Sequence, residues 1–123
     1  MRDPGFILLY VSDTPRSTSF YSRLLGREPV EASLTFAMFA LANGLMLGLW
    51  QQDGVTPAVA HLGGGAELAF PVGDDATVDA QHAEWQAAGI AITQAPTDLD
   101  FGRSFLGVDD DGHRLRVFCP ARG

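Results

Sequence analysis

The sequence predicts an α+β fold of two tandem β-α-β-β-β units, because its second half repeats the pattern of its first. Residues 7–26 and 68–89 each combine an apolar strand, an aspartate-containing turn and a helix that ends at a glycine. The turns share a short motif, Val-Ser-Asp at 11–13 and Val-Gly-Asp at 72–74. A repeat of this length indicates two similar supersecondary units. We therefore expect a single domain, residues 1–123, whose units cover about 5–51 and 66–119 and are joined by a linker at 52–65.

The first unit opens with an apolar strand at 6–11 and continues into a helix. Asp13 or Thr14 can cap that helix, because a short polar side chain can accept a hydrogen bond from a free backbone N–H of the first turn. Pro15 follows near the first helical position, where a missing N–H costs nothing. Gly26 can adopt the left-handed conformation that ends many helices. Helical spacing predicts one apolar stripe, formed by Phe20, Tyr21, Leu24 and Leu25.

Three strands complete the first unit, at about 28–32, 35–41 and 45–51. Residues 42–44 between the last two read Ala-Asn-Gly, and Asn-Gly is a strong signal for a tight hairpin. Residues 52–65 then break all periodicity and include a run of glycines. A phosphate-binding loop would need a lysine and a strand-loop-helix spacing, so a flexible linker is the better interpretation of this segment.

The second unit repeats this order. A strand at 67–72 precedes a helix that Asp74 or Asp75 can cap, and three further strands follow near 90–94, 103–108 and 113–119. On the helix, the spacing places Trp85 on the apolar face, so we expect it to pack in the core rather than in a site. The other residues on or near that face are Val78, His82 and Ala88.

Two features of the last strand pair have both a structural and a functional interpretation. The segment 109–112, Asp-Asp-Asp-Gly, lacks the ligand spacing of a helix-loop-helix calcium site, and Asp-Gly before a strand predicts a hairpin turn instead. Cys119 is the only cysteine, which excludes an internal disulfide. A free cysteine in a strand is more often a buried apolar residue than a reactive thiol, so we assign it to the core.

Composition restricts the class of partner. The formal net charge is −7 and the chain contains no lysine, so it lacks the clustered positive charge that nucleic acid requires. No apolar run approaches the ~20 residues that span a bilayer. The N-terminus, Met-Arg-Asp-Pro-Gly, has an acid and a proline where a signal peptide needs an apolar segment. We therefore expect a cytoplasmic protein that binds neither nucleic acid nor membrane.

The strand-helix segment VSDTPRSTSFYSRLLG and the final FGRSFLGVDDDGHRLRVF resemble the vicinal oxygen chelate superfamily, which includes glyoxalases, bleomycin-resistance proteins and extradiol dioxygenases. The resemblance covers essentially the whole chain and implies a cupped mixed sheet. Within the group, the chain is most similar to phenazine-antibiotic resistance proteins and other small drug-binding members. The motifs that suggest this are LYVSDTPRSTSFY, the strand end Leu49-Trp50, Thr97-Asp98 and DGHRLRV.

The resemblance also implies where metal ligands would lie. Metal-dependent members carry two histidines and two glutamates on equivalent strands of the two units. The matching positions in this chain hold Phe6, Gly48, Glu67 and Arg116. A divalent ion needs about three or more protein donors, and only Glu67 remains. We therefore expect neither a metal nor another cofactor.

Strand alternation predicts which side chains share the concave face with these positions, because residues i and i+2 of a strand point the same way. The resulting wall is mostly aromatic and apolar, a composition typical of ligand pockets. Gly48 would leave open the space of a glutamate, beside the flat ring of Trp50. Arg103 and Arg116 could pair with a ligand carboxylate. The candidate ligand-binding residues are Phe6, Tyr10, Phe36, Met38, Met46, Gly48, Trp50, Glu67, Arg103 and Arg116.

The leading hypothesis is a metal-independent protein that binds and sequesters a planar aromatic antibiotic or metabolite, such as a phenazine, and so gives resistance or self-protection. The resemblance further implies a homodimer, in which the β-α-β-β-β units are exchanged or not. One alternative is an enzyme of the superfamily, either a metal-free lyase or isomerase in which a raised pKa makes Glu67 a base, or a metal enzyme with relocated ligands. Another is a packed scaffold that binds a protein partner.

Overall fold

A computed structural model describes residues 2–121, and its two halves each form a compact unit, with the boundary between Gly63 and Gly64. Each unit contains one helix and a four-stranded mixed sheet, in the order strand, helix and three strands along the chain. This confirms the predicted tandem β-α-β-β-β architecture. The boundary falls inside the predicted linker, most of which has no regular structure apart from a short 3₁₀ helix at Gln52–Gly54.

The sheet of the first unit has the strand order β1-β4-β3-β2. Strand β1 (Phe6–Val11) runs parallel to the central strand β4 (Met46–Gln51), which pairs antiparallel with β3 (Phe36–Ala40). The hairpin between β3 and β4 turns at Gly44, whose φ of 89° suits glycine, as the Asn-Gly signal predicts. Strand β2 (Glu31–Ala32) is a two-residue edge strand and is shorter than predicted.

Helix α1 (Thr14–Leu25) begins and ends where the sequence indicates. The carboxylate of Asp13 accepts a hydrogen bond from the backbone N–H of Arg16, and Gly26 ends the helix with a φ of 64°. The side chain of Gln51 fixes the start of the helix to the end of β4, since its Oε1 accepts hydrogen bonds from both the N–H and the hydroxyl of Thr14. The helix packs against β3 and β4.

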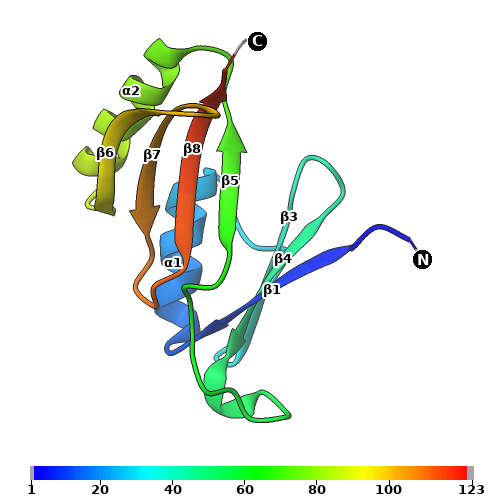
Figure 1. The fold of residues 1–123 in the computed structure, drawn as a ribbon. Coiled ribbons are helices and arrows are strands. Elements are labelled where there is room, and N and C mark those ends of the chain that lie inside the picture. The colour runs from blue at the N-terminus through cyan, green and yellow to red at the C-terminus, as the bar shows by residue number, and fades with distance from the viewer. Residues whose placement is uncertain (1, 122–123) are drawn as a thin grey trace. The chain divides into compact units, whose positions relative to one another are not determined.

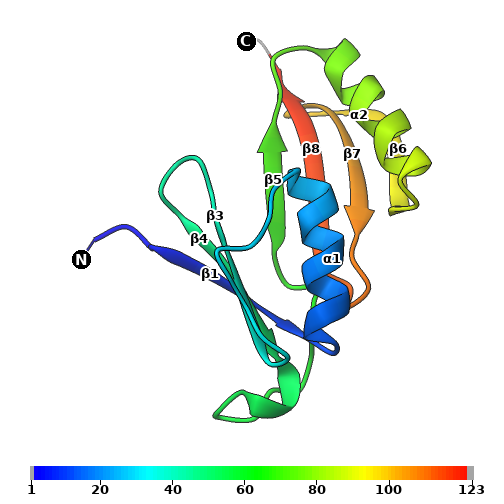
Figure 2. The ribbon, with the colours of Figure 1, turned by 180° about the vertical axis from the view of Figure 1, so that it is seen from behind.

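The sheet of the second unit has the equivalent strand order β5-β8-β7-β6, which can be followed in Figure 1. Strand β5 (Glu67–Pro71) runs parallel to β8 (Arg114–Pro120), and β7 (Gly102–Val108) pairs antiparallel with β8 and with β6 (Ala91–Leu99). Helix α2 (Asp75–Ala87) lies along one face of this sheet in both views of the ribbon (Figures 1 and 2). The opposite face of the same sheet carries no helix of this unit among the described residues.

Helix α2 is anchored to its sheet through Trp85. The indole ring meets Phe105 edge-on at 5.0 Å between ring centroids and Phe70 at 6.1 Å, and it lies directly over Gly107. Trp85 is 7% exposed and Cys119 is 6% exposed, which confirms that both belong to the core. After the helix, Gly89 has a φ of 79° and the N–H of Ile90 bonds back to the carbonyl of Trp85, so a glycine closes α2 as predicted.

Two further details of the second unit are the length of strand β6 and the turn between β7 and β8. Strand β6 is nine residues long, whereas the sequence predicted a strand near 90–94, and it contains two register shifts against β7. The acidic segment 109–112 is a hairpin turn, as predicted. In it, the carboxylate of Asp109 accepts hydrogen bonds from the backbone N–H groups of Asp111 and His113.

Among residues 2–121, no helix is both long and apolar enough to cross a membrane.

Candidate functional site

The register of the first sheet gathers the predicted apolar wall on one face. Across β1 and β4, Phe6 lies opposite Met46 and Tyr10 opposite Trp50. Because directly paired residues point to the same side of a sheet, these rows form a continuous surface. We call this surface the aromatic face; its members are Phe6, Leu8, Tyr10, Phe36, Met38, Met46, Gly48 and Trp50.

The aromatic face is only partly covered in the single chain. Phe6 is 54% exposed and Leu8 is 45% exposed, whereas the intervening residues of β3 and β4, such as Phe39 and Leu49, are fully buried. Trp50 lies at one end of the face, is partly exposed, and meets the ring of Tyr10 edge-on at 6.3 Å between centroids. The strand alternation read from the sequence therefore identifies which side chains share this surface.

The sequence predicts open space beside Gly48, but in the structure neighbouring side chains occupy this space. A Cβ atom at this position would lie 2.6 Å from the Cδ2 of Leu8 and 3.1 Å from the Cζ of Phe36. The two neighbouring side chains thus close over the glycine, which is itself buried. They do so because nothing projects from Gly48 to hold them apart, and close packing is favourable. A flat ligand would therefore meet the surface formed by these side chains rather than a slot at Gly48.

The second sheet carries a polar group on the face opposite α2. The guanidinium of Arg116 binds the carboxylate of Glu67 with two hydrogen bonds, Nε to Oε1 at 2.6 Å and Nη2 to Oε2 at 2.8 Å. Its Nη1 donates to the hydroxyl of Ser104 at 2.8 Å, and its Cζ lies 5.8 Å from the ring centroid of Phe101. We call Glu67, Phe101, Ser104 and Arg116 the Arg116 cluster. Sequence reasoning missed Ser104 and Phe101, although alternation from Arg116 through its partner Leu106 reaches Ser104.

The Arg116 cluster makes Glu67 a poor general base. The hydrogen bonds from Arg116 lower the pKa of the Glu67 carboxyl below its usual value of 4.5, against the smaller opposing effect of partial burial. The same pairing raises the pKa of the Arg116 guanidinium. Both groups are therefore charged near neutral pH. The hypothesis that an apolar environment raises the pKa of Glu67 is wrong, because the guanidinium next to it favours the ionised carboxylate.

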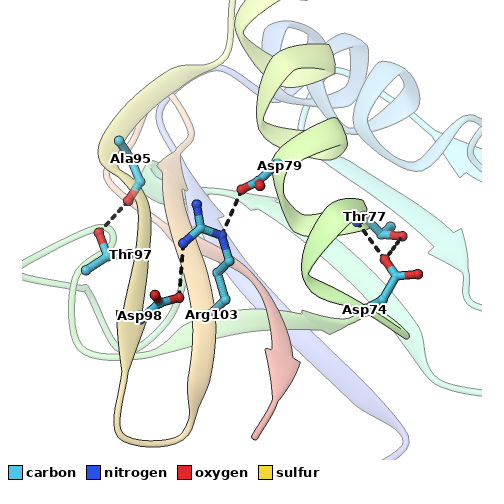
Figure 3. Close-up of polar contacts among 7 residues, drawn as sticks. All are labelled: Asp74, Thr77, Asp79, Ala95, Thr97, Asp98 and Arg103. Atoms are coloured by element: carbon cyan, nitrogen blue, oxygen red, sulfur yellow. Dashed lines mark hydrogen bonds and ion pairs between the residues drawn. The ribbon is translucent and has the colours of Figure 1, made fainter.

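Arg103 lies on the other face of the second sheet. It is paired with Cys119 in the register, and its Nε bonds Asp79 of α2 at 2.9 Å while its Nη1 bonds Asp98 of β6 at 3.0 Å (Figure 3). Arg103 directly precedes Ser104 in β7, and adjacent residues of a strand point to opposite faces. The structure thus does not bring Arg103 together with Arg116, contrary to the expected position beside the concave face.

Arg103 instead borders a cavity of about 500 Å³ on the helix side of the second unit. The start of α2 forms one wall, where the carboxylate of Asp74 accepts hydrogen bonds from the N–H and hydroxyl of Thr77 (Figure 3). Both Asp74 and Arg103 therefore already have protein partners. The other lining residues are Asp75, Asp98, Leu99, Gly102, Cys119, Pro120 and Ala121.

Comparison with known proteins shows the family to which this chain belongs. Residues 4–117 match the model of the Glyoxalase/Bleomycin resistance protein/Dioxygenase superfamily. The chain belongs to this superfamily. It is 34% identical to the phenazine antibiotic resistance protein EhpR of Enterobacter agglomerans over 122 residues, which are 95% of this chain and 91% of that protein.

Two solved structures are similar to this chain over nearly its whole length. The solution structure of protein ATC0852 from Agrobacterium tumefaciens is 50% identical, with a TM-score of 0.91 over 99% of this chain and 100% of that one. A glyoxalase-related enzyme from Fulvimarina pelagi is 24% identical, with a TM-score of 0.83 over 97% of this chain and 88% of that one, which shows a shared fold alone.

The residues at the four positions where the resemblance implies metal ligands do not fit a metal ion. Phe6 and Gly48 offer no donor atom, and Arg116 brings a positive charge that already binds Glu67. Across residues 2–121, no three side chains of His, Cys, Asp or Glu come together in a way that could hold a metal.

Proposed function

We propose that this chain binds and sequesters a planar aromatic antibiotic or metabolite of the phenazine type, without a metal, and so gives resistance or self-protection. The observation that carries the proposal is the aromatic face, which ends in the partly exposed indole of Trp50. The similarity to a protein named for phenazine antibiotic resistance supports the choice of ligand class.

The chemistry of the aromatic face suits a flat apolar ligand. Trp50 offers a ring for offset stacking, and the thioethers of Met38 and Met46 adapt to irregular shapes and contact ring edges favourably. Phe6 and Leu8 add exposed apolar area that a ligand would remove from water. Protection would then depend on the affinity and the amount of protein, because each bound molecule is withdrawn from solution rather than converted.

No specific observation favours the enzymatic alternative. A metal-free lyase or isomerase would need Glu67 as a base, and that carboxylate is held in two hydrogen bonds by Arg116. The cytoplasmic location and the homodimer, with or without exchanged units, stay part of the proposal.

Titration of the intrinsic tryptophan fluorescence with phenazines and quinones tests this function. We expect quenching with a dissociation constant on the order of 1 μM, equivalent to about 8 kcal/mol of binding free energy. Because Trp85 is buried between α2 and its sheet, the quenched signal should come from Trp50 and disappear in Trp50→Phe. An absence of quenching with every planar compound would count against sequestration.

A further inference from the structure

Gly48 lies at the centre of the aromatic face, on the middle one of the three strands that form it. In the register it is paired with Leu8 of β1 on one side and with Met38 of β3 on the other. A rise of about 3.3 Å per residue places it about 7 Å from Trp50 along β4. A ligand of three fused rings that stacks on Trp50 and lies along β4 therefore extends over Gly48.

Two apolar side chains meet above the backbone of Gly48. The Cδ2 of Leu8 and the Cζ of Phe36 both lie within 3.1 Å of the point where a Cβ atom would be, and the glycine is buried beneath them. Both atoms are the far ends of side chains, so a residue with a Cβ atom at position 48 would push them apart or outward. Either movement would break the even surface at the centre of the face.

From this packing we propose that Gly48 is a specificity-determining residue. Without a side chain it lets Leu8 and Phe36 form an even surface, which selects ligands that are planar throughout over ring systems that contain a saturated ring. The inference rests on the proposed function and names the shape that its ligand must have. A gap of about 0.5–1 Å already loses about a quarter to a half of the van der Waals attraction between two atoms. The hydrogen atoms above and below a saturated ring would open such a gap.

Phenazine and 1,2,3,4-tetrahydrophenazine are a matched pair of probes, because they share one ring skeleton and differ in the saturation of one outer ring. We expect the wild-type chain to bind phenazine at least about tenfold more tightly in calorimetric titrations. The loss of one aromatic ring weakens stacking by itself, so variants of the surface are needed to assign the preference to Gly48.

The variant Gly48→Ala should displace the ends of Leu8 and Phe36, so that phenazine no longer contacts the whole face. We expect its affinity for phenazine to fall by about tenfold and its preference for phenazine to fall to about threefold or less. Gly5→Ala is the matched control in the same unit, because a Cβ atom at Gly5 meets nothing within 4 Å and its φ is not in the left-handed region. It should keep the preference of the wild type.

Leu8→Ala tests the same surface without crowding Gly48. It opens a hollow that the hydrogen atoms of the saturated ring can enter, so the preference should again fall to about threefold or less. The combined variant Leu8→Ala/Gly48→Ala places a methyl group beside the space that Leu8 vacates. It should regain a preference of at least about fivefold, because changes at residues in contact compensate each other instead of adding.

The outcomes separate the inference from the proposed function. Equal affinities of the wild type for the two probes overturn the selection for planarity and leave sequestration standing. An unchanged preference in Gly48→Ala or, if that variant does not fold, in Leu8→Ala overturns the role of Gly48, as does a combined variant whose preference stays low. If neither probe binds the wild type, the proposed function fails and the inference fails with it. A preference that Gly48→Ala loses, Gly5→Ala retains and the combined variant regains supports both.

Discussion

Replacing Trp50 with alanine is expected to weaken the binding of a planar aromatic ligand by about 5- to 150-fold, because stacking on an aromatic side chain contributes about 1–3 kcal/mol. The indole is partly exposed at the end of the aromatic face, next to the ring of Tyr10. Alanine would remove the flat surface while the neighbouring side chains stay in place. Calorimetric titration with phenazine-1-carboxamide measures this loss without depending on tryptophan fluorescence.

Two variants serve as controls for the affinity measured with Trp50→Ala. Trp50→Phe keeps an aromatic ring and should retain most of the affinity. Leu34→Ala removes a side chain that is 79% exposed and lies outside the aromatic face, so its affinity should match that of the wild type. If Trp50→Ala binds as tightly as the wild type, the ligand does not stack on Trp50 and the aromatic face is not the binding surface.

The substitution Gly102→Ala is expected to lower the free energy of unfolding by about 3 kcal/mol or more, the range reached when strained backbone and overlap combine. Gly102 has a φ of 137°, a conformation that side-chain-bearing residues rarely adopt. A Cβ atom there would lie 1.9 Å from the carbonyl oxygen of Cys119 and 2.8 Å from the amide nitrogen of Ala121. Both are backbone atoms of the neighbouring segment, so no side chain can move aside to relieve the overlap.

Thermal unfolding would show this effect as a decrease in Tm of about 10 °C or more for a chain of this size. Gly65→Ala is the control in the same unit, because a Cβ atom at Gly65 meets nothing within 4 Å and its φ is not in the left-handed region. Equal melting temperatures for Gly102→Ala and Gly65→Ala would show that the first position of β7 tolerates a side chain, contrary to this geometry.

The parts of the fold that depend on local chemistry could be predicted from the sequence. The caps at Asp13 and Asp74 and the glycines at 26, 44 and 112 each follow from the conformations that single residues prefer. The extent of β6 could not, because its two register shifts depend on pairing with β7 and not on its own alternation.

The candidate site also has a part that the sequence predicts and a part that it does not. Period-two alternation identified the aromatic face, since seven of the ten predicted residues lie on it and only the register was needed. It did not reveal that Leu8 and Phe36 close over Gly48, because side-chain packing depends on neighbours from other strands. Likewise, the pairing of Arg116 with Glu67 was open until the distance between them was known.

Equilibrium dialysis followed by mass spectrometry of the ligand tests sequestration most directly. After prolonged incubation of the protein with phenazine-1-carboxamide, we expect the compound to be retained by the protein in a fixed ratio and to be recovered chemically unchanged on denaturation. A modified product that accumulates beyond one equivalent per chain would show turnover, and the account of this protein as a binding protein would be contradicted.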